Sequence, residues 1–145
     1  MSKIRHTIVP VAYAIFKKDD KYLLSRRFNT GFADGNYSFV CGHVEADEPA
    51  KTAALREAFE EVGIALKPEN LRFVHALYMK SVDREDIRIF FECTQWEGDP
   101  SIMEPEKCDD LSWFSKNNVP ETTLPYVIHV MNQIENKMPY SEFGW

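Results

Sequence analysis

Residues 42–64 read GHVEADEPAKTAALREAFEEVGI, and this stretch decides the fold that we expect for the chain. Its second half carries three glutamates, Glu57, Glu60 and Glu61. At about 100° per helical residue, Glu60 and Glu61 fall roughly 60° and 40° to either side of Glu57, so the three carboxylates share one helix face. The pattern predicts a helix whose front of clustered negative charge is a platform for a divalent metal ion.

The same helical wheel divides the remaining residues into two groups. The apolar stripe predicted to face the core is Leu55, Ala58, Phe59 and Val62. The small residues predicted on the carboxylate side, where a bulky side chain would obstruct a ligand, are Ala50, Ala53 and Ala54. We expect Asp47 to cap the start of the helix, with Pro49 in its first turn, and Gly63 to end it.

A surface helix with ion pairs is the simpler reading of these charges, for instance with Arg56 and Glu60 paired at i,i+4. Two features of the sequence argue against it. The three carboxylates lie together with a single arginine to offset them. The loop before the helix adds acids of its own, among them Glu45 and Glu48.

Outward from this stretch, apolar patterns predict strands and a second helix. A period-2 alternation over residues 9–16 predicts a strand, and a polar turn returns the chain in a hairpin. The further strands are expected at 22–27, 37–41, 71–81, 86–96 and 111–114, a second helix at 124–137, and a tail at 138–145 that packs on the body. Strands that precede, separate and follow two helices predict a mixed α/β (α+β) fold, with one mixed sheet between helices on both faces.

Composition predicts one domain over residues 1–145, because this length buries a sizeable core. The net charge of −6 argues against a protein that coats nucleic acid. No long apolar run predicts a membrane span, and the polar N-terminal stretch is unlike a signal peptide. Three cysteines without CxxC spacing, Cys41, Cys93 and Cys108, favour a reducing cytoplasm over a disulfide framework or zinc site.

Residues 42–64 resemble the Nudix box: Gly, five residues, Glu, seven residues, then Arg-Glu-hydrophobic-any-Glu-Glu-any-Gly-hydrophobic. Every fixed position is filled, by Gly42, Glu48, Arg56, Glu57, Ala58, Glu60, Glu61, Gly63 and Ile64. Many members have Pro-Gly-Gly where this chain has Val40-Cys41-Gly42, which affects the expected loop geometry. The resemblance implies the Nudix fold, an α/β/α sandwich with a mixed sheet.

The resemblance also implies roles for the residues of the box. Nudix hydrolases use Mg²⁺ or Mn²⁺, hard cations that prefer carboxylate and carbonyl oxygens. By resemblance Glu57, Glu60 and Glu61 are the metal ligands, joined by the Gly42 carbonyl, and Arg56 orients a carboxylate. Glu48 is expected to brace the loop against the helix or to act as an outer ligand rather than as a base.

Two residues near the box are expected to contact substrate. Ser25-Arg26-Arg27 resembles the end of the second strand in MutT-like members, which favours Arg27 as a nucleotide contact; two solvated arginines are the alternative. His43 follows the fixed glycine and is either a phosphate or water contact or a loop-packing residue.

Two later segments carry further expected site residues. In Met103-Glu104-Pro105-Glu106, both glutamates are candidates for a general base or an additional metal ligand, and an exposed acidic loop is the alternative. In residues 120–126, Thr122 and Thr123 are expected either to hydrogen-bond a base edge or to cap the following helix.

The expected function is that of a MutT-like Nudix hydrolase, a Mg²⁺-dependent enzyme that cleaves a nucleoside triphosphate, including oxidised or non-standard ones, to the monophosphate and pyrophosphate. The alternatives are an ADP-ribose or nucleotide-sugar pyrophosphatase, a catalytically inactive Nudix-fold nucleotide-binding module, and isomerase chemistry on the same fold. The expected partner is a small nucleotide, with neither nucleic-acid coating nor a membrane, and a homodimer is open.

Overall fold

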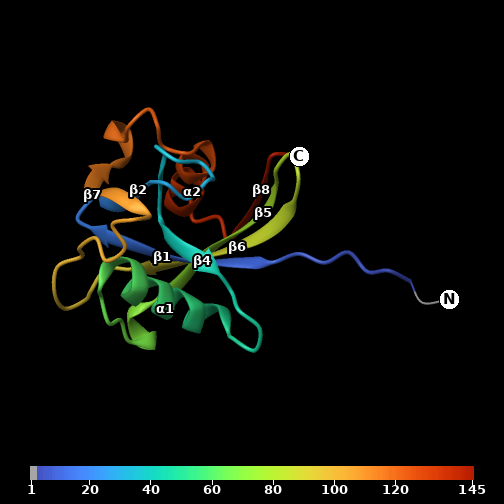
Figure 1. The fold of residues 1–145 in the computed structure, drawn as a ribbon, viewed down its shortest axis with the longest axis horizontal. Helices are drawn as coiled ribbons and strands as arrows, with labels where there is room; N and C mark the ends of the chain where they lie inside the picture. Colours follow the sequence, from blue (N-terminus) through green and yellow to red (C-terminus); the bar gives the residue numbers. More distant parts are fainter. Residues whose placement is uncertain (1–2) are drawn as a thin grey trace.

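The structure, a computed structural model, describes residues 3–145, in which an eight-stranded mixed sheet lies between two helices (Figure 1). Helix α1 spans Ala50–Val62 and α2 spans Pro125–Glu135, and they cover opposite faces of the sheet. The strands are β1 (Pro10–Lys18), β2 (Lys21–Arg27), β3 (Tyr37–Ser38), β4 (Val40–His43), β5 (Arg72–Lys80), β6 (Glu85–Cys93), β7 (Cys108–Ser115) and β8 (Tyr140–Phe143). The predicted sandwich is therefore confirmed.

Strand order places the N-terminal strand at the centre of the sheet. The order is β3-β2-β1-β6-β5-β8, with β4 paired to β1 and β7 paired to β2. The pairs β1–β6 and β5–β8 are parallel, and the other pairs are antiparallel. Strand β7 begins three residues before the predicted start because Cys108 pairs with Arg27 beyond a bulge at Asp109 of β7.

Alternation along β1 builds two cores, one on each face. Val11, Tyr13 and Ile15 point into the core beneath α2, and Ala12 and Ala14 point into the core beneath α1. The period-2 pattern of the sequence thus marks a strand buried on both sides.

The packed face of α1 differs from the predicted one. Ala53 and Ala54, expected on the open side, are fully buried, whereas Phe59, expected in the core, is 59% exposed. Ala58 and Val62 are buried as expected, and Leu55 is only partly buried. The physical reason is small-on-small packing, because the alanines of α1 meet Ala12 and Ala14 of β1 and bring the helix close to the sheet. The carboxylates therefore lie at the edge of the packed face.

Of the two predicted ends of α1, the start is wrong and the end at Gly63 is confirmed. Asp47 does not cap the helix: the N-cap position is Pro49 and no side chain caps it. The loop forms its own turn instead, since the Glu48 N–H donates to the Glu45 carbonyl (3.2 Å) and the Glu45 N–H donates to Oε1 of Glu48 (3.1 Å). Gly63 ends the helix in the left-handed conformation (φ 74°), as predicted.

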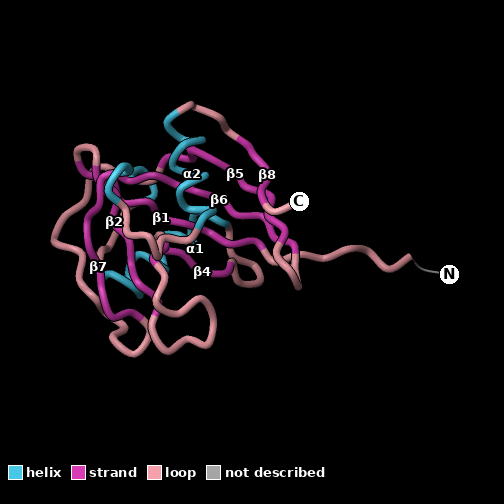
Figure 2. The backbone as a smooth tube through the Cα atoms, turned by 90° about the horizontal axis from the view of Figure 1, so that it is seen from above, coloured by secondary structure: helices cyan, strands magenta, loops and turns pink. Residues whose placement is uncertain are grey.

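The C-terminal tail packs on the body, as expected. It forms β8 beside β5, and Nε1 of Trp145 donates to the Tyr78 carbonyl (3.1 Å). Residues 3–9 instead extend away from the sheet (Figures 1 and 2). Within residues 3–145, no helix has the length and apolar character needed to cross a membrane.

Candidate active site

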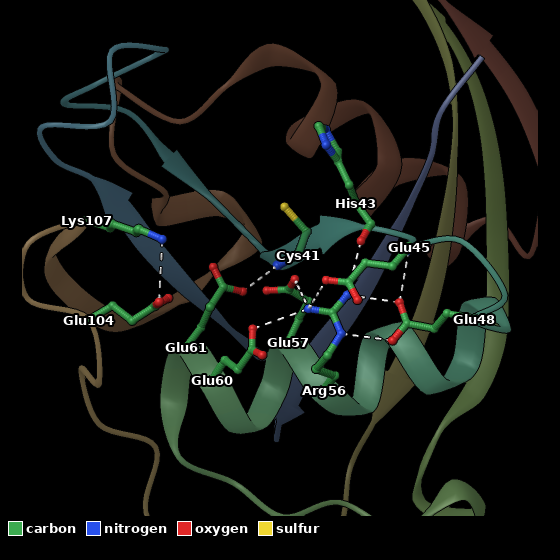
Figure 3. Close-up of polar contacts among 10 residues, drawn as sticks. All are labelled: Cys41, His43, Glu45, Glu48, Arg56, Glu57, Glu60, Glu61, Glu104 and Lys107. Carbon is green, nitrogen blue, oxygen red and sulfur yellow. Dashed lines mark hydrogen bonds and ion pairs between the residues drawn. The ribbon is translucent and has the colours of Figure 1, made fainter. Parts of the chain in front are cut away.

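Arg56 connects the loop before α1, strand β4 and the helix itself (Figure 3). Its guanidinium donates twice to Glu48, from Nε to Oε2 (2.9 Å) and from Nη2 to Oε1 (3.0 Å), and once to the His43 carbonyl (3.2 Å). Nη1 donates to Glu57 (2.8 Å) and Glu60 (3.3 Å). The hydrogen bonds from Arg56 lower the pKa of Glu48 to about 2. Glu48 therefore has the geometry of a brace between loop and helix.

The three glutamates of α1 differ in environment. Glu60 lies at the exposed edge, Glu57 is partly buried against Arg56, and Glu61 accepts the Cys41 N–H (3.0 Å). Burial raises the pKa of Glu57. Burial also raises the pKa of Glu61 well above its usual value, and the neighbouring Glu57 and Glu104 carboxylates raise it further. Carboxylates that are desolvated and close to one another gain from a nearby positive charge, so this cluster suits a cationic ligand.

Gly42 lies directly against the carboxylates. A Cβ atom at this position would overlap Oε1 and Cδ of Glu57, so the position of this carboxylate against β4 requires glycine. The fixed glycine of the sequence motif is thus explained by contact with Glu57.

The glutamates open into a cleft of about 760 Å³ that crosses from α1 to the start of α2. It is lined by Val11, Tyr13, Arg27, Phe32, Ala33, Ser38, Cys41, Gly42, His43, Glu57, Glu60, Glu61, Met79, Ser81, Arg84, Arg88, Glu104, Lys107, Leu124, Pro125, Tyr126 and Phe143. A second cavity of about 380 Å³ shares six lining residues with it: Arg27, Ser38, Cys41, Glu61, Glu104 and Lys107. The volume suits a nucleotide-sized ligand.

The structure brings only some of the expected residues together. Arg27 and His43 line the cleft, although Nε of Arg27 also donates to the Phe32 carbonyl (2.7 Å). Glu104 lines both cavities and pairs with Lys107 (3.6 Å), across from Glu61 (Figure 3). Glu106 is exposed and outside the lining of both.

The two threonines lie elsewhere. Thr122 is exposed, Thr123 is buried, and neither is in the lining of the cleft. Neither caps α2, whose N-cap residue is Leu124 without a side-chain cap. The backbone explains their placement, since the Thr122 carbonyl accepts the Tyr37 N–H (3.0 Å) and ties this loop to β3.

Sequence reasoning missed a polar group beneath the α2 end of the cleft. Arg88 of β6 is 6% exposed, pairs with Asp86 and donates to the Tyr13 hydroxyl, which in turn contacts Tyr126. The available signal was the alternation of Asp86 and Arg88 with Ile87 and Ile89 in an otherwise apolar strand. Alternation puts the two charges on the face opposite the isoleucines, and that face is also buried because β6 lies inside the sheet between β1 and β5.

The acidic end of the cleft fits a divalent cation in its donor chemistry. Glu57, Glu60, Glu61 and Glu104 supply carboxylate oxygens, and Gly42 leaves its backbone uncovered beside them. Within residues 3–145, no three acid, thiol or imidazole groups already converge as a closed site. Arg56 holds Glu57 and the Cys41 N–H holds Glu61, so these two side chains are positioned by the protein itself.

Comparison with known proteins agrees with this geometry. Residues 6–131 match the family model described as the NUDIX domain. The chain is 28% identical over 117 residues to the NAD-capped RNA hydrolase NudC of Stutzerimonas stutzeri, and the aligned region covers 77% of this chain and 38% of that protein. It is 25% identical over 133 residues to a MutT-like protein of Streptomyces ambofaciens, which covers 91% of this chain and 80% of that protein. The chain thus spans well under half the length of the NudC proteins that it matches.

Two solved structures share the fold. The MutT NUDIX hydrolase from Burkholderia pseudomallei superposes with a TM-score of 0.81 at 22% identity, over 88% of this chain and 98% of that one. The MutT protein from Methanosarcina mazei Go1 superposes with a TM-score of 0.79 at 20% identity, over 93% and 98%.

Proposed function

The chain belongs to the Nudix domain family, and on this premise we propose that it hydrolyses a nucleoside triphosphate to the monophosphate and pyrophosphate. The observation that carries the proposal is the layout of the cleft. Acidic side chains gather at its α1 end, and the cleft continues into a partly apolar pocket of nucleoside size at its α2 end. The resemblance of the sequence to MutT-like members implies the same substrate class, and one matching relative is itself described as MutT-like.

Glu57, Glu60 and Glu61, together with the Gly42 carbonyl, would hold Mg²⁺ or Mn²⁺. When bound, the metal supplies positive charge to phosphate oxygens and lowers the pKa of a coordinated water. Arg56 positions Glu57 through its hydrogen bond and fixes the loop through Glu48.

The remaining roles follow from position in the cleft. Arg27 and Lys107 are the basic residues that line both the cleft and the second cavity, so we assign them to the phosphates. His43 lines the same cleft and is assigned to a phosphate or water. Glu104 faces Glu61 and is the acid that we assign to proton removal from water, because Glu106 lies outside both cavities. The base edge is assigned to the α2 end in place of Thr122 and Thr123.

The test is a nucleotide panel with Mg²⁺, with products resolved chromatographically, on the wild type and on Glu60→Gln and Glu61→Gln. Each variant should lower kcat by on the order of 100-fold, because several kcal/mol of charge stabilisation is lost. Melting temperature should change little, since Glu60 is exposed and an amide replaces a desolvated acid at Glu61.

Glu106→Gln is the matched control, since it removes an acid from the same neighbourhood but outside the cleft. Near-wild-type turnover in both Glu60→Gln and Glu61→Gln at saturating Mg²⁺ would overturn the assignment of the metal ligands. Release of orthophosphate alone would overturn the substrate class. Binding without turnover in the wild type would favour the inactive nucleotide-binding module.

A second candidate is cleavage of a pyrophosphate that joins a nucleoside to a second group. The curated relatives named NAD-capped RNA hydrolase NudC favour it, as does a structural neighbour described as a bifunctional NMN adenylyltransferase/ADP ribose pyrophosphatase. NAD⁺ and ADP-ribose therefore belong in the panel. These substrates give two monophosphates and no pyrophosphate, so the products separate the two candidates.

We also propose a cytoplasmic location, which the three free cysteines favour. A homodimer stays a prediction.

A further inference from the structure

Five side chains form a buried hydrogen-bonded group, the Arg88 network, beneath the α2 end of the cleft. Arg88 donates to Asp86 from Nε (2.8 Å) and Nη2 (3.1 Å), and from Nη1 to the Tyr13 hydroxyl (2.9 Å). Tyr13 donates to the Tyr126 hydroxyl (2.9 Å), which lies 2.7 Å from Oγ of Ser38. Four of the five, all but Asp86, line the cleft.

The network presents hydrogen-bond donors to the cleft and has few acceptors to spare. An arginine has five N–H groups. Three of those on Arg88 are engaged, which leaves one N–H on each terminal nitrogen. Both oxygens of Asp86 already accept from Arg88, and Oδ2 also forms an ion pair with Arg84 (3.2 Å). Because a buried guanidinium gains most from partners for every N–H, this part of the cleft suits a ligand group with two adjacent acceptors.

The position of the network relative to the acids identifies which part of a nucleotide reaches it. Glu57, Glu60 and Glu61 lie at the α1 end, so the phosphates belong there. At the opposite end the walls include Met79, Leu124 and Phe143, and apolar side chains of this kind pack against the faces of a ring. A base seated between these walls has its edge toward the Arg88 network.

We propose that Arg88 determines base specificity and selects bases with an oxo group next to an unprotonated ring nitrogen. Guanine and hypoxanthine present this pair at O6 and N7, and cytosine presents it at O2 and N3. Adenine places an amino donor beside each candidate acceptor on those edges, and uracil has N3–H between its two oxo groups. The proposal rests on the proposed function for the placement of the phosphates.

This assignment predicts opposite preferences for amino and oxo groups in purines and in pyrimidines. Among purines the 6-oxo base should exceed the 6-amino base, whereas among pyrimidines the 4-amino base should exceed the 4-oxo base. Selection by size, or a general preference for amino or oxo groups, would not reverse in this way. A bidentate pair is worth a factor of about 10 to 100 between right and wrong base.

The experiment measures kcat/KM of the wild type for ITP against ATP and for CTP against UTP. Both ratios should be about 10 or more. Arg88→Lys keeps a positive charge beside Asp86 but loses the planar fork, so both ratios should fall toward one, mainly through KM. Arg84→Lys is the matched control: Arg84 also contacts Asp86 and lines the cleft but makes no bond to Tyr13, so both ratios should persist.

Binding measurements separate this inference from the proposed function. Calorimetry without Mg²⁺ should rank IMP above AMP and CMP above UMP, whether or not the triphosphates are substrates. If hydrolysis is absent but this ranking holds and Arg88→Lys abolishes it, the inference stands and the proposed function fails. Equal affinities in the wild type would overturn the inference, and so would a ranking that survives Arg88→Lys in a folded protein. It would also be overturned if Arg88→Lys lost the binding of inorganic pyrophosphate but kept its discrimination between bases.

Discussion

At the scale of the residue, the backbone of Gly42 lies directly against Glu57, a proposed metal ligand. Its φ angle lies outside the left-handed region, so its lack of a side chain is explained by contact with Glu57 rather than by a special φ angle. The blocking atoms are the far end of a flexible side chain. A methyl group here would therefore displace the carboxylate before it displaced the strand.

Gly42→Ala should for this reason reduce activity far more than stability. We expect kcat/KM to fall by about 10- to 100-fold, as for loss of a residue that orients a metal ligand, with a melting temperature within a few degrees of wild type. Steady-state kinetics and thermal unfolding measure the two effects. A double-mutant cycle with Glu57→Ala supplies the control, because Gly42→Ala should add little once Glu57 is absent. Additive losses would contradict a contact through Glu57.

At the scale of an element, helix α1 packs on the sheet with a face that borders its carboxylates. Ala53, Ala54 and Ala58 bring it against β1, and this close approach places Glu57 and Glu61 against the middle of β4. Many amphipathic helices pack on the core with large apolar side chains. Here the packed side chains are mainly alanines, and the large apolar Phe59 is exposed.

Two substitutions test which face is packed. Ala54→Leu should lower the free energy of unfolding by about 1–3 kcal/mol, because extra methylene groups have no room between α1 and β1. Phe59→Ser should change it by no more than about 0.5 kcal/mol, as for other exposed positions. Denaturant unfolding measures both. The reverse ranking would mean that the helix packs by the face that periodicity alone predicts.

This contrast shows what the sequence can and cannot predict. Periodicity placed β1, β2, β5, β6, β7 and both helices to within about three residues, since alternation such as that of Val11 and Tyr13 is set by local geometry. It gave one strand where β3 and β4 lie, and it gave β8 only as a tail that packs on the body. A helical wheel shows which residues share a face but not which face meets the sheet. Arg88 was missed, and the loop of Thr122 misplaced, because both depend on partners far away in the sequence.

At the scale of the whole molecule, two histidines join the tail to the body. Nδ1 of His75 donates to the Met138 carbonyl (2.6 Å), and its Nε2 accepts from Oγ of Ser141 (2.7 Å). His129 of α2 donates to the same Ser141 oxygen (2.9 Å). These bonds connect β5, β8 and α2 with both rings neutral.

Acid should therefore loosen the tail. Burial lowers the pKa of both His75 and His129 below the usual 6.5. The unfolded state then binds more protons between the folded pKa and 6.5, so stability is complete above pH 6.5 and declines as pH falls below it. Hydrogen exchange at residues 140–143 should accelerate between about pH 7.5 and pH 5.5 after correction for intrinsic rates. The double variant His75→Asn/His129→Gln should lose this dependence, and an equal acceleration in it would contradict a histidine origin.

Parallel pairing of β1 with β6 also delays the assembly of the sheet. Val11 and Arg88 are register partners, so β1 gains this neighbour only after a long loop that includes α1 has closed. The β5–β6 hairpin closes through a short turn and can form early, whereas β8 has no partner until β5 is in place. Chains dominated by distant pairings fold slowly. The cleft draws its walls from α1, α2 and every strand except β7, so it is among the last features that the folding chain completes.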